Sequence, residues 1–132
     1  MICALDSNIV SYMLKEDSDV IARYRKAYDD GDDFVIPPIV FYEVQRGLLA
    51  KNLKKKLSKF NALCQKIEQV EFDSAVWQKA AQIYASLSQQ GKMIDDADIF
   101  IAAFCLVNDC ALITNNTRHF VNISGLKLVN WK

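Results

Sequence analysis

The sequence lacks the residues and segments that several large classes of protein need. It has one histidine, and its four cysteines include no Cys-x-x-Cys pair, so we expect neither a zinc site nor a disulfide framework, only reduced thiols. No apolar run approaches the length of a membrane span, and the apolar start of the chain is cut off at once by Asp6, unlike a signal peptide. We therefore expect a cytosolic protein with no role in a membrane.

The sequence also lacks net charge, internal repeats, linkers and low-complexity segments. Its 132 residues are 52% hydrophobic, which predicts one compact domain over residues 1–132. The charges balance but are unevenly spread, because basic residues gather in the middle of the chain: Arg46, Lys51, Lys54, Lys55, Lys56, Lys59 and Lys66. These lysines are either the solvated face of a helix or a surface that contacts phosphates.

Short apolar segments separated by helical patterns run through the whole chain. Strands are expected at residues 2–5, 34–36, 70–72, 111–114 and 126–129, the second ended by Pro37 and Pro38. A long amphipathic helix is expected through Leu53 to Ile67, and a later one, capped by Asp73 and ending near Gly91, should turn Val76, Trp77, Ala80, Ala81 and Tyr84 inward. This alternation predicts an α/β fold with a parallel sheet of four to five strands, flanked by helices.

The stretch from Gly91 to Asn108 has the most unusual pattern. Three carboxylates, Asp95, Asp96 and Asp98, run directly into an unbroken apolar segment over residues 99–107. An apolar surface on all sides is typical of a buried helix, and Asp95 or Asp96 fits its N-cap. Asp98 lies three residues inside that cap, where an unpaired carboxylate is costly. We therefore expect a partner for Asp98, and a bound cation is one candidate.

Three acids are predicted to meet at one rim of the sheet, where parallel strands place their carboxyl ends. Asp6 ends the first strand, whereas Glu43 and Asp98 lie early in helices that adjoin the second and fourth strands. Taken singly, Asp6 could be a helix cap, Glu43 a surface residue, and Asp98 the partner of a buried lysine or arginine. Together they predict a site for a hard divalent cation, since gathered like charges must be neutralised.

The chemistry of the predicted site follows from its ligands. Oxygen ligands without histidine or cysteine suit Mg²⁺ or Mn²⁺, which bind phosphate oxygens and assist in-line displacement at a phosphodiester. Asn116 could complete the shell or orient a water molecule. His119, the only histidine, lies outside this set, and we do not expect it to be a ligand or a general base.

Four short motifs in order resemble those of PIN-domain proteins, most closely the VapC-type toxins of bacterial toxin–antitoxin pairs. They are Leu5-Asp6-Ser7-Asn8, Tyr42-Glu43-Val44 with Gly47, Asp95 to Ala103, and Thr114 to Phe120. The resemblance covers essentially the whole chain. It implies a parallel sheet flanked by helices, an Mg²⁺- or Mn²⁺-dependent endoribonuclease that acts on RNA, a homodimer, and a cognate VapB-like antitoxin that occludes the site.

The family's residues carry over position by position. Asp6, Glu43 and Asp98 match its metal-binding acids, and Asn116 stands where many PIN domains have a fourth acid. An amide there implies weaker binding of a second metal. Asp95 could compensate, although it ranks behind Asn116.

Two other functions share part of this pattern. Haloacid-dehalogenase-type phosphatases and phosphoacceptor receivers also place an aspartate at the end of the first strand, but the phosphatase needs a second aspartate where this chain has Asn8. The receiver's acidic pair and late lysine are also not evident. A non-catalytic RNA- or antitoxin-binding module with an incomplete acidic site is the other alternative, and Asn116 favours it.

Overall fold

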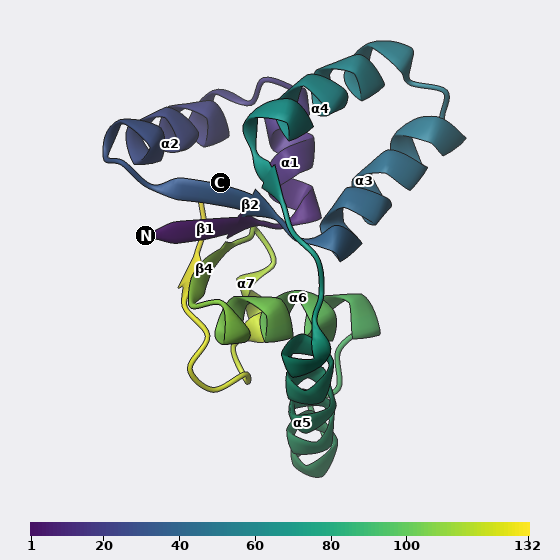
Figure 1. Cartoon of the computed structure of the whole chain (residues 1–132), viewed down its shortest axis with the longest axis vertical. Helices are drawn as coiled ribbons and strands as arrows, with labels where there is room; N and C mark the ends of the chain where they lie inside the picture. Colours follow the sequence, from purple (N-terminus) through teal and green to yellow (C-terminus); the bar gives the residue numbers. More distant parts are fainter.

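A computed structural model describes residues 1–132 of the chain (Figure 1). Five strands form one sheet in the order β3-β2-β1-β4-β5, and all neighbouring strands are parallel. The strands are β1 (Ile2–Leu5), β2 (Asp33–Ile36), β3 (Glu68–Gln69), β4 (Cys110–Ile113) and β5 (Leu128–Val129). The helices are α1 (Ser7–Leu14), α2 (Ser18–Asp29), α3 (Pro38–Ala50), α4 (Lys54–Lys66), α5 (Ser74–Gln90), α6 (Asp96–Val107) and α7 (Thr117–Phe120). The predicted α/β class with a helix-flanked parallel sheet is confirmed.

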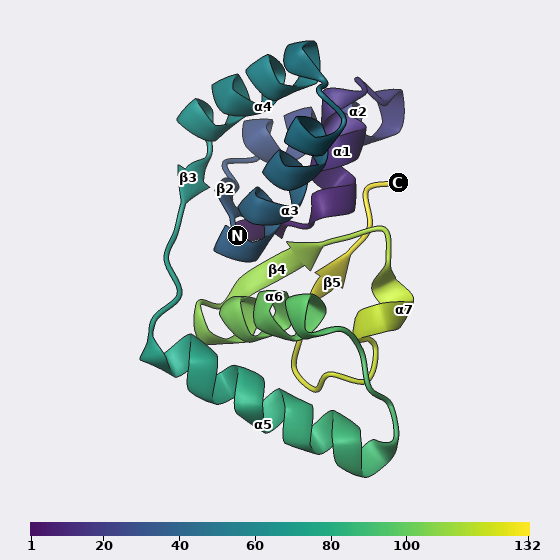
Figure 2. The same ribbon diagram turned by 90° about the vertical axis from the view of Figure 1, so that its right-hand side faces the viewer.

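The centre of the sheet is the pair β1 and β4. Cys3, Ala4 and Leu5 of β1 are fully buried, which explains why this strand is apolar on both faces. Helices α1 to α4 lie on one side of the sheet, whereas α5, α6 and α7 lie on the other, as two perpendicular views show (Figures 1 and 2). Because all strands are parallel, their carboxyl ends meet at one rim.

The predicted buried helix is α6, which packs between the sheet and α5 (Figure 2). Its residues Ile99 and Ile101 to Cys105 are buried, as expected for an apolar surface on nearly all sides. Asp95 occupies the N-cap position but makes no side-chain capping bond. The first turn of α6 therefore leaves its carboxylates free for other contacts.

The amphipathic helix predicted through Leu53 to Ile67 is confirmed as α4, with Leu53 and Ile67 at its two caps. A turn at Asn52, whose φ is +53°, separates it from α3. The predicted third strand, however, has different bounds in the structure. A strand was expected at residues 70–72, but the paired residues are Glu68 and Gln69. Phe72 instead packs its ring against Phe104, at 5.9 Å between centroids.

The inward face of α5 also differs from the prediction. Its buried residues are Val76, Ala80, Ile83 and Leu87, on one stripe with helical spacing. Trp77, Ala81 and Tyr84 are instead exposed. The prediction that Trp77 and Tyr84 point inward was wrong, because a large aromatic ring can pack at the edge of a core while half of it remains in water.

The cysteines are free thiols, and Cys3, Cys105 and Cys110 are buried. Burial raises the pKa of the Cys3 thiol to about 11, so it stays protonated and unreactive at neutral pH. None of the helices is both long and apolar enough to cross a bilayer.

Candidate active site

Asp6 is the most enclosed acid of the site. It follows β1 directly and caps α1, with its Oδ1 accepting a hydrogen bond of 2.8 Å from the backbone N–H of Ser7. Only 3% of Asp6 is exposed. The expectation that Asp6 acts as a helix cap is thus confirmed for Oδ1, one of its two carboxylate oxygens.

The second oxygen of Asp6 is held from the end of β4. Thr114, which is fully buried, donates its hydroxyl proton to Oδ2 of Asp6 over 2.7 Å, and Asn8 donates an N–H to the same atom over 3.3 Å. The hydroxyl oxygen of Thr114 accepts the backbone N–H of Asn116 at 3.0 Å, while Oδ1 of Asn8 accepts that of Asn115 at 3.0 Å. These bonds bring the corner that holds Asn116 against Asp6. Sequence reasoning did not assign these roles to Thr114 and Asn8.

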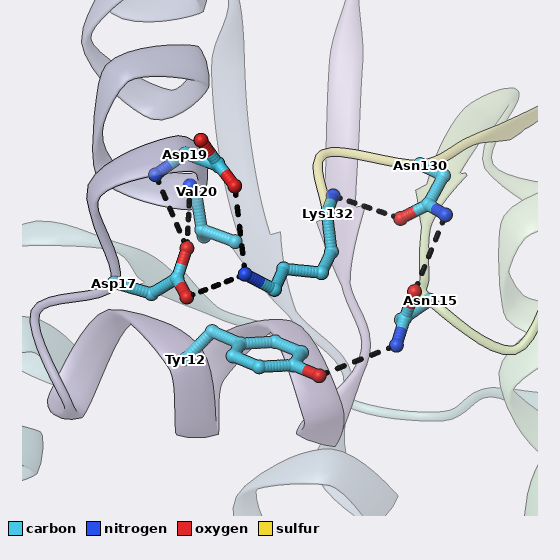
Figure 3. A network of polar contacts seen from close by, with 7 residues as sticks. All are labelled: Tyr12, Asp17, Asp19, Val20, Asn115, Asn130 and Lys132. Carbon is cyan, nitrogen blue, oxygen red and sulfur yellow. Dashed lines mark hydrogen bonds and ion pairs between the residues drawn. The ribbon is translucent and has the colours of Figure 1, made fainter.

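A second polar network holds the same corner from outside (Figure 3). The side chain of Asn115 donates to the hydroxyl of Tyr12 at 3.3 Å and accepts from Asn130 at 3.3 Å. Lys132 donates its backbone N–H to Asn130 at 2.9 Å, and its ammonium group lies 2.8 Å from Oδ2 of Asp17. The corner is therefore anchored to α1 and to the last strand as well as to Asp6.

Asp98 lies in the first turn of α6, with 20% of its side chain exposed. Its partner is neither a lysine nor an arginine, because Nδ1 of His119 lies 3.2 Å from its Oδ2. Burial and the negative charge of Asp6 raise the pKa of Asp98, while His119 opposes the shift. The histidine placed outside the site by the sequence is thus in contact with one of its acids.

Glu43 lies in the second turn of α3 and is half-buried. Burial raises its pKa, the charges of Asp6 and Asp98 raise it further, and Arg46 opposes the shift. Since the charge of Asp6 raises the pKa of both Glu43 and Asp98, and that of Asp98 also raises the pKa of Glu43, the three acids share one electrostatic environment. The structure therefore brings the three predicted acids to the same rim.

The two secondary candidates, Asp95 and Asn116, are exposed. The charge of Asp95 adds to the raised pKa of Asp98. Asn116 stands at the N-cap of α7 without a side-chain capping bond, and it lines a groove together with Glu43. Both side chains are free to contact a ligand.

The fit of this site to a metal ion depends on its donor atoms. No group of three or more carboxylate, histidine or cysteine side chains lies close enough together to enclose an ion directly. An all-oxygen donor set in which the pKa values of Glu43 and Asp98 are raised nevertheless suits a hard cation, and Mg²⁺ commonly retains several of its waters. The residues therefore fit an ion that is held partly through its water molecules. Alternatively, the charge of the ion would draw the carboxylates closer together when it binds.

The largest hollow of the molecule lies elsewhere. Its volume is about 1000 Å³, and it is lined by Ile2, Asp33 and Glu68 at the starts of three strands. A smaller groove of about 390 Å³ contains Glu43 and Asn116. Because functional sites in parallel sheets lie at the carboxyl ends of the strands, we assign the site to the smaller groove and its rim.

Comparison with known proteins adds an independent line of evidence. The PIN domain family model matches residues 3–126. The chain is 27% identical to a protein of Rickettsia felis named ribonuclease VapC2, over 99% of this chain and 98% of that protein. It is 26% identical to a Shigella flexneri protein named tRNA(fMet)-specific endonuclease VapC, over 96% of each.

Solved structures give the same result. A chain in the crystal structure of VapBC2 from Rickettsia felis, bound to a promoter DNA fragment, superposes with a TM-score of 0.92 at 26% identity, over 100% of both chains. A chain of VapBC-1 from nontypeable Haemophilus influenzae gives a TM-score of 0.87 at 25% identity, over 99% of this chain and 98% of that one.

Proposed function

Because the chain belongs to the PIN-domain family, we propose that it is a divalent-metal-dependent endoribonuclease, the toxin of a type II toxin–antitoxin pair. The observation that carries the proposal is the meeting of Asp6, Glu43 and Asp98 at one rim, where burial and then the negative charge of Asp6 raise the pKa values of Glu43 and Asp98. Acids in such an arrangement favour a cation between them. The names of the VapC relatives support RNA as the substrate.

Asp6, Glu43 and Asp98 would hold Mg²⁺ or Mn²⁺, with Asp95 as a further candidate. Such an ion, when bound, supplies positive charge to the scissile phosphate and to the leaving oxygen. The ligand Asp6 is oriented in advance, since Thr114 and Asn8 fix its Oδ2. An oriented ligand loses little entropy when the ion and the substrate arrive.

The hydrolytic step needs a water molecule positioned in line with the bond that breaks. The water oxygen forms a bond to phosphorus and gives up a proton, while the bond from phosphorus to the leaving ribose oxygen breaks and that oxygen takes up a proton, so that one water molecule is consumed and the protons balance. The amide of Asn116, exposed beside Glu43 in the groove, would orient this water. The backbone N–H bond from Asn116 to Thr114 ties that amide to the position of Asp6.

The proposal extends to partners and place of action. The similar chains in VapBC structures support a VapB-like antitoxin that covers the site, and we propose that the chain acts as a homodimer. An RNA substrate and such an antitoxin would place its action in the cytoplasm.

A second function, a non-catalytic RNA- or antitoxin-binding module, is favoured by two observations. The acids do not form a ready-made cluster of three, and an amide stands at position 116. The two functions differ in their response to metal, because only an intact cation site gives metal-dependent cleavage.

The test is cleavage of total cellular RNA by the purified protein with Mg²⁺, with Mn²⁺ and with a chelator. Asp98→Asn should lose at least about a hundredfold in rate, because it removes a charged ligand of the cation that would stabilise charge at the reacting phosphate. Asp96→Asn is the matched control, since Asp96 is an exposed acid in the same helical turn. Initiator tRNA is the first purified substrate to try, because the Shigella flexneri relative bears its name.

Metal-dependent fragments that disappear in Asp98→Asn and persist in Asp96→Asn would establish the nuclease. If neither ion produced fragments from any RNA, the binding module would replace it.

A further inference from the structure

The groove that contains Glu43 and Asn116 continues away from the acids into a basic region. Its far part is lined by Lys15, Lys51 and Lys56. We call this part the lysine groove and define it by these three residues and Gly47. Of the three acids of the rim, Glu43 lines the same groove.

The three lysines come from different elements that converge on the groove. Lys15 follows α1, Lys51 follows α3, and Lys56 lies in the first turn of α4. None of them forms a salt bridge, whereas Lys26, Lys59 and Lys132 are each paired with a carboxylate. The groove therefore carries three ammonium groups that form no salt bridge with a carboxylate of the protein.

Gly47 has no structural reason to be glycine. It lies inside α3, its φ is not positive, and a Cβ atom there would meet no other atom within 4 Å. Glycine is nevertheless among the poorest helix formers. A glycine that neither the backbone nor the packing requires indicates a close approach by something outside the chain.

The position of Gly47 shows where that approach would occur. Glu43, Gly47 and Lys51 are spaced four residues apart, so they lie on one line along α3, and all three line the groove. From Glu43 to Lys51 the line extends about 12 Å at roughly 1.5 Å per residue. Glu43 and the ammonium group of Lys51 are thus separated by Gly47, where no side chain covers the helix backbone. A few nucleotides can span this length.

We propose that the lysine groove binds the RNA backbone beside the scissile phosphate. Lys15, Lys51 and Lys56 contact successive phosphates, and Gly47 lets the strand approach the surface of α3. This inference rests on the proposed function, because it takes the acids as the place where the strand is cut. An RNA strand suits the groove better than an acidic peptide does, since the strand must continue past the acids on at least one side.

The first test measures binding of a fluorescent single-stranded oligoribonucleotide in chelator, so that cleavage does not contribute. A triple variant, Lys15→Gln, Lys51→Gln and Lys56→Gln, should bind at least about tenfold more weakly at low salt. Its slope of log affinity against log salt should fall by about 2, or 0.7 for each lost phosphate contact. An unchanged slope would overturn the proposal.

The matched control carries Lys54→Gln, Lys55→Gln and Lys79→Gln. It loses the same charge, and two of its lysines adjoin Lys56, yet none of the three lines the groove. We expect wild-type binding or a small loss without a comparable change in slope. An equal loss of RNA affinity in both triple variants would show that binding depends on overall charge, and it would overturn the proposal that the lysine groove binds RNA.

A second variant tests the groove without removing charge. Gly47→Gln should raise the melting temperature by a few degrees, because glutamine is a better helix former, while it weakens RNA binding by filling the groove. Ala50→Gln, at an exposed position in the last turn of α3, should leave binding unchanged. Wild-type RNA binding by a folded Gly47→Gln variant would contradict the proposal.

Polyglutamate as competitor separates RNA from an acidic protein partner. Poor displacement of the oligoribonucleotide by polyglutamate supports RNA as the ligand. Equally effective displacement would overturn RNA and assign the groove to an acidic peptide.

The outcomes for the groove and for the nuclease remain distinct. Metal-dependent cleavage by the wild type, combined with lysine-independent binding, would refute the groove and keep the nuclease. Lysine-dependent RNA binding without cleavage would support the groove and refute the nuclease.

Discussion

The site joins two kinds of acid that the protein treats differently. Asp6, at the end of β1, accepts hydrogen bonds from Ser7, Thr114 and Asn8. Asp98, in the first turn of α6, has one side-chain partner, His119, and its pKa is raised. The first acid is fixed by the fold, whereas the second carries a charge that its surroundings oppose. The difference indicates that Asp6 serves both stability and function, and that Asp98 serves function at a cost in stability.

The most direct way to break this comparison is the same substitution at both acids. Asp6→Ala should lower the free energy of unfolding by about 2–4 kcal/mol, because it removes a helix cap and leaves the buried Thr114 hydroxyl without its acceptor. Asp98→Ala should leave the metal-free protein as stable as the wild type or more stable, because it removes a like charge. Urea unfolding in chelator measures both. Equal destabilisation by the two variants would show that the acids do not differ.

A smaller effect is expected when only the support of Asp6 is removed. Thr114→Val keeps the shape of the side chain but deprives Oδ2 of Asp6 of its closest donor and the N–H of Asn116 of its acceptor. The unfolding free energy should fall by roughly 1–3 kcal/mol. Thr117→Val, whose residue makes no side-chain hydrogen bond in the structure, should change it by less than about 0.5 kcal/mol. The same urea titration measures both variants. If Thr114→Val were as stable as Thr117→Val, the role of Thr114 as a support of Asp6 would be contradicted.

Divalent metal should reduce the cost in stability of the ionised Glu43 and Asp98, and this stabilisation should depend on pH. Burial and the charge of Asp6 raise the pKa values of Glu43 and Asp98 above their ordinary 4.5 and 3.8, so at a pH below these ordinary values the folded protein bears little of their repulsion. As the pH rises through the raised values both groups ionise, and the metal-free protein loses stability. Stabilisation by Mg²⁺ should therefore grow from about pH 4.5 to pH 7 and reach about 1.4 kcal/mol at ten times the dissociation constant.

Thermal melting with Mg²⁺ and with chelator across this pH range measures the stabilisation. Asp98→Asn should lose most of it, whereas Asp96→Asn should retain it. If stabilisation by Mg²⁺ were constant across the pH range, metal binding would not depend on the ionisation of Glu43 and Asp98.

The smallest expected effect concerns the partner of Asp98. His119 lowers the pKa of Asp98, so His119→Ala should raise that pKa and move the acidic limb of the cleavage rate to higher pH. The shift should be a fraction of a pH unit, because 54% of the His119 side chain is exposed and solvent screens the interaction. Rates measured from about pH 5 to 8 test this, with Arg118→Ala as the control. An acidic limb that does not move would leave the histidine without influence on the site.

The sequence allowed the buried elements and the three acids to be predicted, because each rests on a local pattern. The apolar run of α6 and the paired prolines after β2 determine their elements without long-range information. The amphipathic pattern from Leu53 to Ile67 likewise located α4 and both of its caps. The exposed Trp77 was missed because hydrophobic pattern does not distinguish the edge of a core from its interior.

The contacts that complete the site could not be predicted from local pattern. Thr114 and Asp6 lie 108 residues apart, and Asp98 and His119 lie 21 apart. In each case the sheet order or the packing of α6 on α7 brings the pair together. A threonine at the end of a strand, taken alone, predicts no particular partner.

The pairing of β1 with β4 has a consequence for the timing of protein synthesis. A ribosome makes β1 and Asp6 well before β4, because β2, β3 and six helices lie between them in the chain. Until β4 has emerged and docked, Asp6 lacks Thr114, and Asn116 has no place beside it. Chains are made at roughly 5–20 residues per second, so several seconds separate the first acid from its support. During translation, therefore, the nascent chain carries these acids unassembled, and a ribosome-bound fragment that ends before β4 is expected to be inactive.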